Sequence, residues 1–372
     1  MAFIIKDFSM QAFNNDVNHS GDLDDKYKKW TDYRNKVAAF IGRRLNEKDI
    51  EDSKNGIKKQ AAKEAIDVVF EKPSEEIEQQ VVEEVINENS EQIIDQFSDA
   101  DFLLDTYEDI GTAAIIFAAG ECNDLDLEKI TDKFDRVVLT DVDTTSIYEG
   151  IKRQNISQDV QDKLKVKHVE YTGLAELKFF ETLADIVSKA KPLRQVILHI
   201  QTLEDMVFDP QPFSELQGKF DFAICSPAYT QLVYTQMEVL LQVIKRFDVY
   251  SDIEIEQLNQ TVYRKVPGII ARYNDLVLST LKPDGRVIML TDVVEIPQGH
   301  KMITQLQARL AQKKVDHHEL FKFVRDFGLE LGVTGYQDLK KKVQLTDAAF
   351  MLWPFDEHKQ YLVLQMCGKK QI

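Results

Sequence analysis

Residues 113–124, AAIIFAAGECND, decide the fold, because a continuous apolar run ends there in a glycine and then in polar residues. Such a run is typical of a buried strand in a parallel sheet, which is covered on both faces and therefore does not alternate. Similar runs follow along the chain, at 136–141, 166–171, 220–225 and 286–291. Stretches of helical length and period separate them, which predicts a parallel sheet with helices on both faces.

The C-terminal part of the chain breaks this alternation. Residues 348–353 and 360–366 are apolar runs separated only by residues 354–359. A connection that short cannot hold a crossover helix, so the two strands must be antiparallel neighbours. We therefore predict an α/β fold with a Rossmann-like, seven-stranded, mostly parallel sheet and an antiparallel terminal hairpin. Residues 195–200 fit either a strand or a buried helix.

The first 110 residues show helical periodicity and no strand-like run. Between 24 and 45, apolar residues three or four apart predict a helix, and its stripe of Trp30 and Tyr33 should pack against the sheet. Residues 71–109 hold 14 acidic residues and one basic residue, so a helix at 74–97 should turn a charged face to solvent. We predict a helical N-terminal region, 1–110, followed by a sheet domain, 111–372.

Composition excludes several classes of protein. The chain has 372 residues and a formal charge of −17, and no basic stripe favours nucleic-acid binding. No apolar run has the roughly 18 residues of a membrane-spanning helix, and the first residues do not read as a secretory signal. Cys122, Cys225 and Cys367 lie too far apart for a paired metal site, and no other metal-ligand spacing occurs. We expect a cytoplasmic protein without a structural metal.

The candidate site follows from the ends of the first two predicted strands. Ligands of open parallel sheets bind at the carboxyl ends of the strands. Gly120 follows the first strand and lets the backbone approach a ligand, and Asp141 comes 21 residues later, at the end of the second. An acid at that distance hydrogen-bonds the ribose hydroxyls of a nucleoside cofactor. Because the loop holds one glycine and no diphosphate fingerprint, we predict a cofactor with ribose and adenine but no phosphate.

This pattern resembles the class I S-adenosylmethionine-dependent methyltransferases over roughly residues 110–370. The resemblance rests on five strand-end motifs and the terminal hairpin: AAGECND at 118–124, TDVD at 140–143, EYTG at 170–173, SPAY at 226–229 and LKPDGR at 281–286. It implies that the first loop wraps the methionine moiety, that the acid after strand two holds the ribose, and that the residues after strand three flank the adenine. The cofactor-binding residues it implicates are Ala118, Gly120, Glu121, Cys122, Asn123, Asp141, Glu170 and Tyr171.

The motif at 226–229 has two interpretations. Ser226-Pro227-Ala228-Tyr229 resembles the (Asp/Asn/Ser)-Pro-Pro-(Tyr/Phe) motif of amino-methylating members, which makes Ser226 and Tyr229 the catalytic candidates. The same residues also fit a helix start, with a serine cap and a proline in the first turn. Under either interpretation we expect Tyr229 and Gln231 to face the cofactor crevice.

The leading hypothesis is S-adenosylmethionine-dependent methyl transfer to an unidentified acceptor, a small molecule or a protein, with the N-terminal helices covering the crevice. Direct displacement depends on in-line positioning, which accounts for the lack of an acid–base pair. An alternative is a catalytically inactive S-adenosylmethionine-binding or scaffold protein, because Ala118 and Cys122 replace two of the three glycines of the family's G-x-G-x-G loop. A second alternative is amino methylation of nucleic acid, against which the missing second proline and the absent basic face both count.

Overall fold

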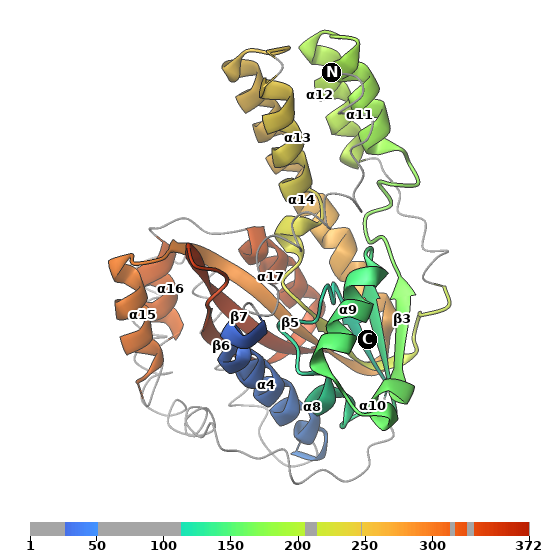
Figure 1. Cartoon of the computed structure of the whole chain (residues 1–372), viewed down its shortest axis with the longest axis vertical. Helices are drawn as coiled ribbons and strands as arrows, with labels where there is room; N and C mark the ends of the chain where they lie inside the picture. The colour runs from blue at the N-terminus through green and yellow to red at the C-terminus, as the bar shows by residue number, and fades with distance from the viewer. Residues whose placement is uncertain are drawn as a thin grey trace.

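The computed structural model describes residues 27–50, 113–204, 214–246, 248–312, 317–325 and 331–371. Figure 1 shows a central sheet with helices packed on it and a group of helices that extends away from it. In chain order the main elements are α4 (Thr31–Ile50), β1 (Ala113–Phe117), α8 (Leu127–Thr131), β2 (Arg136–Asp141), α9 (Thr144–Gln154), α10 (Gln158–Lys163), β3 (Leu164–His168), α11 (Phe179–Ser188), α12 (Leu193–Gln201), β4 (Phe220–Cys225), α13 (Tyr234–Arg246), α14 (Asp252–Thr280), β5 (Leu281–Pro297), α15 (Lys301–Leu310), α16 (His317–Arg325), α17 (Leu331–Lys342), β6 (Val343–Trp353) and β7 (Lys359–Lys370).

The described strands form one mixed sheet in the order β3-β2-β1-β4-β5-β7-β6. Strands β1 to β5 pair in parallel; Ala114 of β1, for example, lies opposite Val137 of β2 and Phe222 of β4. Strand β7 is antiparallel to both of its neighbours, β5 and β6, and so runs against the other six strands. The structure therefore confirms the predicted fold class, a Rossmann-like, mostly parallel sheet with an antiparallel terminal hairpin.

Several strand boundaries differ from the prediction: β6 begins at Val343 and not at 348, and β7 extends to Lys370 and not to 366. The third strand was expected at 166–171 but ends at His168, because its partner β2 ends at Asp141, directly opposite. The fifth strand, expected at 286–291, runs from Leu281 to Pro297 and so includes residues 282–285. A register shift in the pairing of β4 with β5 accommodates these residues as an irregularity within the strand.

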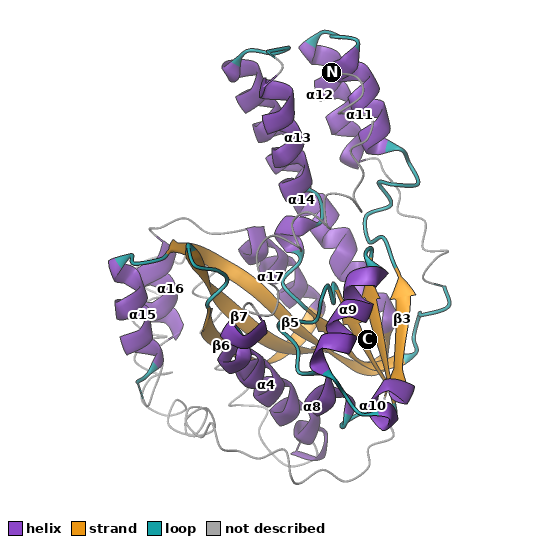
Figure 2. Ribbon diagram, viewed as in Figure 1, coloured by secondary structure: helices purple, strands orange, loops and turns teal. Residues whose placement is uncertain are grey.

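Alternate side chains of the strands serve two separate cores. Ile115 and Phe117 of β1 belong to the larger core, which contains the buried faces of α14 and α17. Ala114 and Ile116 belong to the second core, together with α4, α8 and α9, which Figure 2 shows on one side of the sheet. Because both faces are covered, successive strand residues are apolar, and the runs in the sequence are continuous.

Helix α4 is part of the second core. Tyr33 stacks on the ring of Trp353 of β6 with 5.2 Å between centroids, and Trp30 meets the same ring edge-on at 4.9 Å. The indole N–H of Trp30 also donates a hydrogen bond to the carbonyl oxygen of Phe355, at 2.9 Å. These contacts confirm that the aromatic stripe packs against the sheet. The predicted acidic helix at 74–97 lies outside the described residues.

Helices α11, α12, α13 and the first part of α14 extend beyond the carboxyl ends of the parallel strands, and we call this group the helical projection (Figure 1). Helices α11 and α12 follow β3, whereas α13 and α14 follow β4. Helix α14 has 29 residues and is therefore about 43 Å long, enough to reach from the projection to the sheet. Residues 195–200, for which the sequence left strand and helix open, lie in α12.

Candidate functional site

The loop after β1 has three residues in the left-handed conformation, of which only one is a glycine. Ala118, Gly120 and Cys122 have φ angles of 52°, 48° and 53°. These are the three alternate positions at which the sequence analysis compared the chain with G-x-G-x-G. A left-handed conformation costs a residue with a Cβ roughly 1–2 kcal/mol, and glycine adopts it freely. Ala118 and Cys122 therefore have the same left-handed backbone conformation as Gly120, although each carries a Cβ.

The left-handed conformation of Ala118 predicts that a glycine at this position does not lower the free energy of unfolding as it does elsewhere. Elsewhere, an alanine-to-glycine change in an ordered segment costs about 0.5–1 kcal/mol, through the added freedom of the unfolded chain. At Ala118 the relieved strain offsets that cost, so we expect Ala118→Gly to leave the free energy of unfolding unchanged or to raise it slightly. Urea unfolding measures this, with Ala271→Gly in helix α14 as the control that should lose about 1 kcal/mol. Equal losses in both variants would contradict the strain.

The polar residues of this loop bind the protein itself. The Glu121 carboxylate accepts a hydrogen bond from Arg153 of α9 at 3.0 Å, and the Asn123 side-chain oxygen accepts another at 2.9 Å. The Asn123 amide donates to Glu121 at 3.0 Å, which closes a buried network. Both residues were predicted to bind cofactor, yet both bind Arg153 of α9, and neither lines the pocket at the ends of β1, β2 and β3.

Two further side chains, Gln154 and Arg34, fix the path of the loop with three hydrogen bonds. The Gln154 side-chain amide donates to the carbonyl oxygens of Cys122 and Leu125, at 2.8 and 2.9 Å. Arg34 of α4 donates to the carbonyl oxygen of Asn123 at 2.9 Å. Burial raises the pKa of the Cys122 thiol, with Asp124 adding to the shift, so this cysteine is an inert core residue. Helices on either side of the loop therefore hold it in place.

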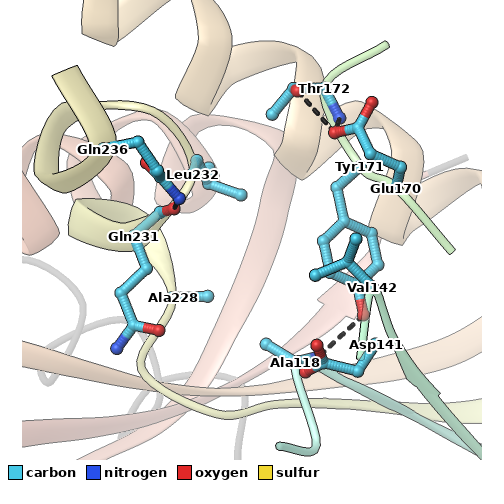
Figure 3. Close-up of a pocket in the computed structure, with 10 residues that line it drawn as sticks. All are labelled: Ala118, Asp141, Val142, Glu170, Tyr171, Thr172, Ala228, Gln231, Leu232 and Gln236. Carbon is cyan, nitrogen blue, oxygen red and sulfur yellow. Dashed lines mark hydrogen bonds between the residues drawn. The ribbon is translucent and has the colours of Figure 1, made fainter. Parts of the chain in front are cut away.

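A pocket lies at the carboxyl ends of β1, β2 and β3, where the sequence placed the cofactor. It has a volume of about 50 Å³. Figure 3 shows two walls, one from the strand ends and one from the segment that leads from β4 into α13. The first wall comprises Ala118, Asp141, Val142, Glu170, Tyr171 and Thr172, and the second comprises Ala228, Gln231, Leu232 and Gln236. The structure thus brings together four of the predicted residues, Ala118, Asp141, Glu170 and Tyr171.

Asp141 is held in place by backbone groups. Its Oδ2 accepts the N–H of Gly120 at 2.9 Å, and its Oδ1 accepts the N–H of Asp143 at 3.0 Å. Burial raises the pKa of Asp141, and the two N–H groups oppose that shift. A carboxylate has about four acceptor positions, so each oxygen can still accept a hydrogen bond from a ligand. Gly120 thus takes part in the site through its N–H.

Glu170 lines the pocket and has one carboxylate oxygen without a hydrogen-bond partner. Its Oε1 accepts the backbone N–H of Thr172 at 2.8 Å and also the Thr172 hydroxyl hydrogen. Its Oε2 is buried and has no hydrogen-bond partner. Because one oxygen is fixed, the other has a defined direction and can accept a hydrogen bond from a ligand donor.

Tyr171 connects the ends of β1 and β2. Its hydroxyl accepts the N–H of Ala118 and donates to the carbonyl oxygen of Thr140, both at 2.8 Å. Burial raises the pKa of this hydroxyl, and the nearby Asp141 adds to the shift. The ring lines the pocket as predicted, but the hydroxyl occupies the first N–H of the loop.

Tyr229 does not face the crevice, so this expectation is wrong. Its side chain is fully buried, and its hydroxyl donates to Asn274 of α14 at 2.7 Å. A Cβ atom added to Gly335 of α17 would lie only 2.3 Å from the Tyr229 ring, so the two elements pack in direct contact. The turn at Tyr229–Gln231 directs the aromatic ring into the larger core, where no substrate can stack on it.

Ser226 also lies outside the pocket. Its side chain is buried beside the Asp124 carboxylate, whose pKa it lowers, and it meets no partner at full hydrogen-bond geometry. The alternative interpretation, a helix cap, is wrong as well, because the first helical turn begins at Tyr229 after Ala228 and has no side-chain cap. The two catalytic candidates are therefore separated from the four residues that line the pocket.

The buried Asp124 predicts a pH dependence of stability. Burial raises its pKa to about 6, although Ser226 and Arg34 act in the opposite direction. Between pH 4 and 6 the folded protein keeps a proton that the unfolded chain releases, so the free energy of unfolding falls as the pH rises through this window. Two pKa units correspond to about 3 kcal/mol.

We therefore expect Asp124→Asn to stabilise the protein at pH 7.5 by up to about 3 kcal/mol more than at pH 4. Asparagine keeps the shape and loses the titration, although it also loses the attraction to Arg34. Urea unfolding of both proteins at the two pH values measures this difference. A stability gap that is the same at both values would show that Asp124 does not titrate in this window.

Most residues of the second wall were not predicted from the sequence. It placed Gln231 at the crevice, but not Leu232 or Gln236. One signal was present: Gln236 lies three residues after Val233 and four before Leu240, so it is a polar residue on the apolar face of its helix. A buried amide at such a position needs a partner, and this requirement points to a functional role.

Two absences hold for the described part of the chain. No three His, Cys, Asp or Glu side chains there come close enough to share a metal ion. None of the helices within those residues combines the length and apolar character that crossing a membrane requires.

Comparison with known proteins gave matches among solved structures only. No family model matches the chain, and no curated protein matches it. A SAM-dependent methyltransferase from Methanosarcina mazei is 11% identical, with 72% of this chain and 95% of that chain covered and a TM-score of 0.35. An arsenic(III) S-adenosylmethionine methyltransferase from Chlamydomonas reinhardtii is 9% identical, with 72% and 66% covered and a TM-score of 0.29.

A third structure is a geranyl diphosphate methyltransferase in complex with GPP and sinefungin, 8% identical, with 75% of this chain and 77% of that chain covered and a TM-score of 0.29. Likenesses of this size say nothing about the ligand of this chain, and the fold is recognised from the sheet itself. The sequence predicted five parallel strands and an antiparallel terminal hairpin, and the structure adds their order, β3-β2-β1-β4-β5, with a reversed β7 between β5 and β6. The chain has the fold of the class I S-adenosylmethionine-dependent methyltransferases.

Proposed function

We propose that the chain binds S-adenosylmethionine in the pocket at the ends of β1, β2 and β3, and that it transfers the methyl group to a small-molecule or protein acceptor. The observation that carries this proposal is the placement of Asp141. Its carboxylate lines the pocket, and one backbone N–H fixes each oxygen. Two oriented oxygens match the vicinal hydroxyls of a ribose.

The remaining residues of the first wall support the same ligand. The free Oε2 of Glu170 suits the exocyclic amine of adenine, and the Tyr171 ring lies beside the same space. The loop from Ala118 to Cys122, with its left-handed residues, would lie along the methionine end. S-adenosylmethionine supplies a methyl group activated by a sulfonium, so the protein's part in the reaction is to position the acceptor in line with it.

Binding requires the two walls to separate. Pockets for ligands of this size have volumes of roughly 300–1,000 Å³, whereas this pocket has about 50 Å³. The second wall belongs to the segment that joins β4 to the helical projection. We propose that this segment moves outward when the cofactor enters and that the helical projection then borders the acceptor.

The described part of the N-terminal region contacts the loop after β1, because Arg34 of α4 donates a hydrogen bond to the carbonyl oxygen of Asn123. We propose the division into residues 1–110 and 111–372 on this basis, with the first part completing the acceptor side. The three cysteines are buried and form no disulfide, which supports a reducing compartment such as the cytoplasm.

A second candidate function is binding without transfer, as an inactive or scaffold protein. One observation favours it: the Tyr171 hydroxyl already occupies the N–H of Ala118 and so closes part of the loop. Amino methylation of nucleic acid has no comparable support, because the Tyr229 ring is packed in the core.

Calorimetry of the full chain with S-adenosylmethionine and with S-adenosylhomocysteine tests the proposal, and mass spectrometry of S-adenosylhomocysteine formation tests transfer. Micromolar binding with product formation on adding an amine, hydroxyl or thiol acceptor from a defined panel supports the methyltransferase. Binding without product across the panel favours the second candidate. Failure to bind either ligand rejects both.

A further inference from the structure

The side-chain amide of Gln236 is buried, and its nitrogen has a hydrogen-bond partner whereas its oxygen has none. It lies on α13 and is 1% exposed. Its Nε2 donates to the carbonyl oxygen of Gln231, which orients the amide. Its Oε1 is buried and has no hydrogen-bond partner. Leaving such an acceptor unpaired costs free energy, and a ligand donor would recover it.

Different polar side chains lie at the two ends of the pocket. Figure 3 shows Asp141 and Ala118 at one end of the first wall, and Glu170 at the other end. Gln236 lies on the opposite wall at the same end as Glu170. The end away from Asp141 therefore carries two buried acceptors without partners, Glu170 Oε2 and Gln236 Oε1.

We propose that Gln236 is a specificity-determining residue for the base of the cofactor, and that its Oε1 accepts one N–H of the exocyclic amine when the walls close on the ligand. This inference rests on the proposed function. A nucleoside has a vicinal diol at one end and, in adenine, an amine with two N–H donors at the other. Asp141 suits the first end, and the Glu170 and Gln236 oxygens suit the second. Through Gln236, helix α13 contacts the base directly.

The contact with the base would stabilise the position of α13 in which the two walls are close together. The residues of the first wall are present whether or not the second wall moves inward. A hydrogen bond from the base to Gln236 forms only when the second wall approaches the ligand, so it favours the closed state of the bound protein. A base with a carbonyl oxygen in place of the amine would meet two acceptors and would oppose closure.

A thermodynamic cycle tests this inference. Calorimetry compares S-adenosylhomocysteine with S-inosylhomocysteine, in which an oxygen replaces the exocyclic amine, for the wild type and for Gln236→Met. Methionine has nearly the length of glutamine and no acceptor. We expect the wild type to prefer the amine by at least about tenfold, and the variant to lose about tenfold of that preference. Gln242→Met, at an exposed position of the same helix, should keep the wild-type ratio.

Each outcome has one meaning. A ratio that falls in Gln236→Met and holds in Gln242→Met supports the contact, because a general loss of stability would weaken both ligands equally. A ratio that is unchanged in Gln236→Met, or a wild type that binds both ligands equally, overturns this inference and leaves the proposed function intact. A wild type that binds neither ligand overturns both.

Discussion

Asp141→Ala should weaken S-adenosylmethionine binding by about ten- to a hundredfold, the effect of losing a charge-assisted pair of hydrogen bonds to the ribose. The backbone N–H groups of Gly120 and Asp143 hold the carboxylate in one orientation, so its free acceptor positions face the pocket. The substitution also leaves those two N–H groups without an acceptor, and we expect the melting temperature to fall. Affinity is therefore measured by calorimetry well below the transition.

Asp143→Ala is the matched control, because it removes a carboxylate two residues away that serves the fold. Asp143 is buried and caps α9, accepting the N–H groups of Thr145 and Ser146 and the Ser146 hydroxyl hydrogen. Its loss should cost about 1 kcal/mol of stability and leave the affinity within a factor of about two. Equal affinity in Asp141→Ala and the wild type would exclude the ribose contact. A loss in Asp143→Ala alone would mean that the ligand uses the other carboxylate.

The strands were predictable because burial on both faces demands apolar residues at every position. Residues 220–225 and 136–141 coincide with β4 and β2 for this reason. The ends of edge strands depend on where the partner stops, which a single run does not encode, and β3 was therefore placed too late. The sequence of the helical projection has helical periodicity, which predicts helices. Periodicity does not predict that these helices extend away from the sheet, because their direction depends on packing between segments far apart in the sequence.

The same distinction explains which of the predicted site residues line the pocket. Asp141, Glu170 and Ala118 directly follow or end strands, so the sheet fixes their position, and the pocket contains them. Glu121 and Tyr229 come four residues after the ends of β1 and β4, and their side chains have partners in Arg153 and Asn274. Those partners are 32 and 45 residues away in the sequence, and strand-end position carries no information about such choices.

Gly150→Ala should unfold or strongly destabilise the protein, with a loss of about 3 kcal/mol or more. Gly150 lies in α9 where the helix backbone meets the loop after β1, and a Cβ atom there would lie 2.0 Å from the carbonyl oxygen of Glu121. That oxygen is backbone and cannot rotate away, so the loop and α9 must separate. Separation would also break the contacts of Arg153 and Gln154 with the loop.

Gly268→Ala is the matched control for this change, because Gly268 is also a helical glycine but has nothing within 4 Å of an added Cβ. There the better helix propensity of alanine should raise the free energy of unfolding by about 1 kcal/mol. Urea unfolding followed by circular dichroism measures both variants. Gly150→Ala should further weaken S-adenosylmethionine binding under conditions where the variant is still folded, since the loop carries Gly120 and Ala118. If both variants gain stability alike, α9 does not hold the loop after β1 by backbone contact, and that loop owes its shape to its own left-handed residues.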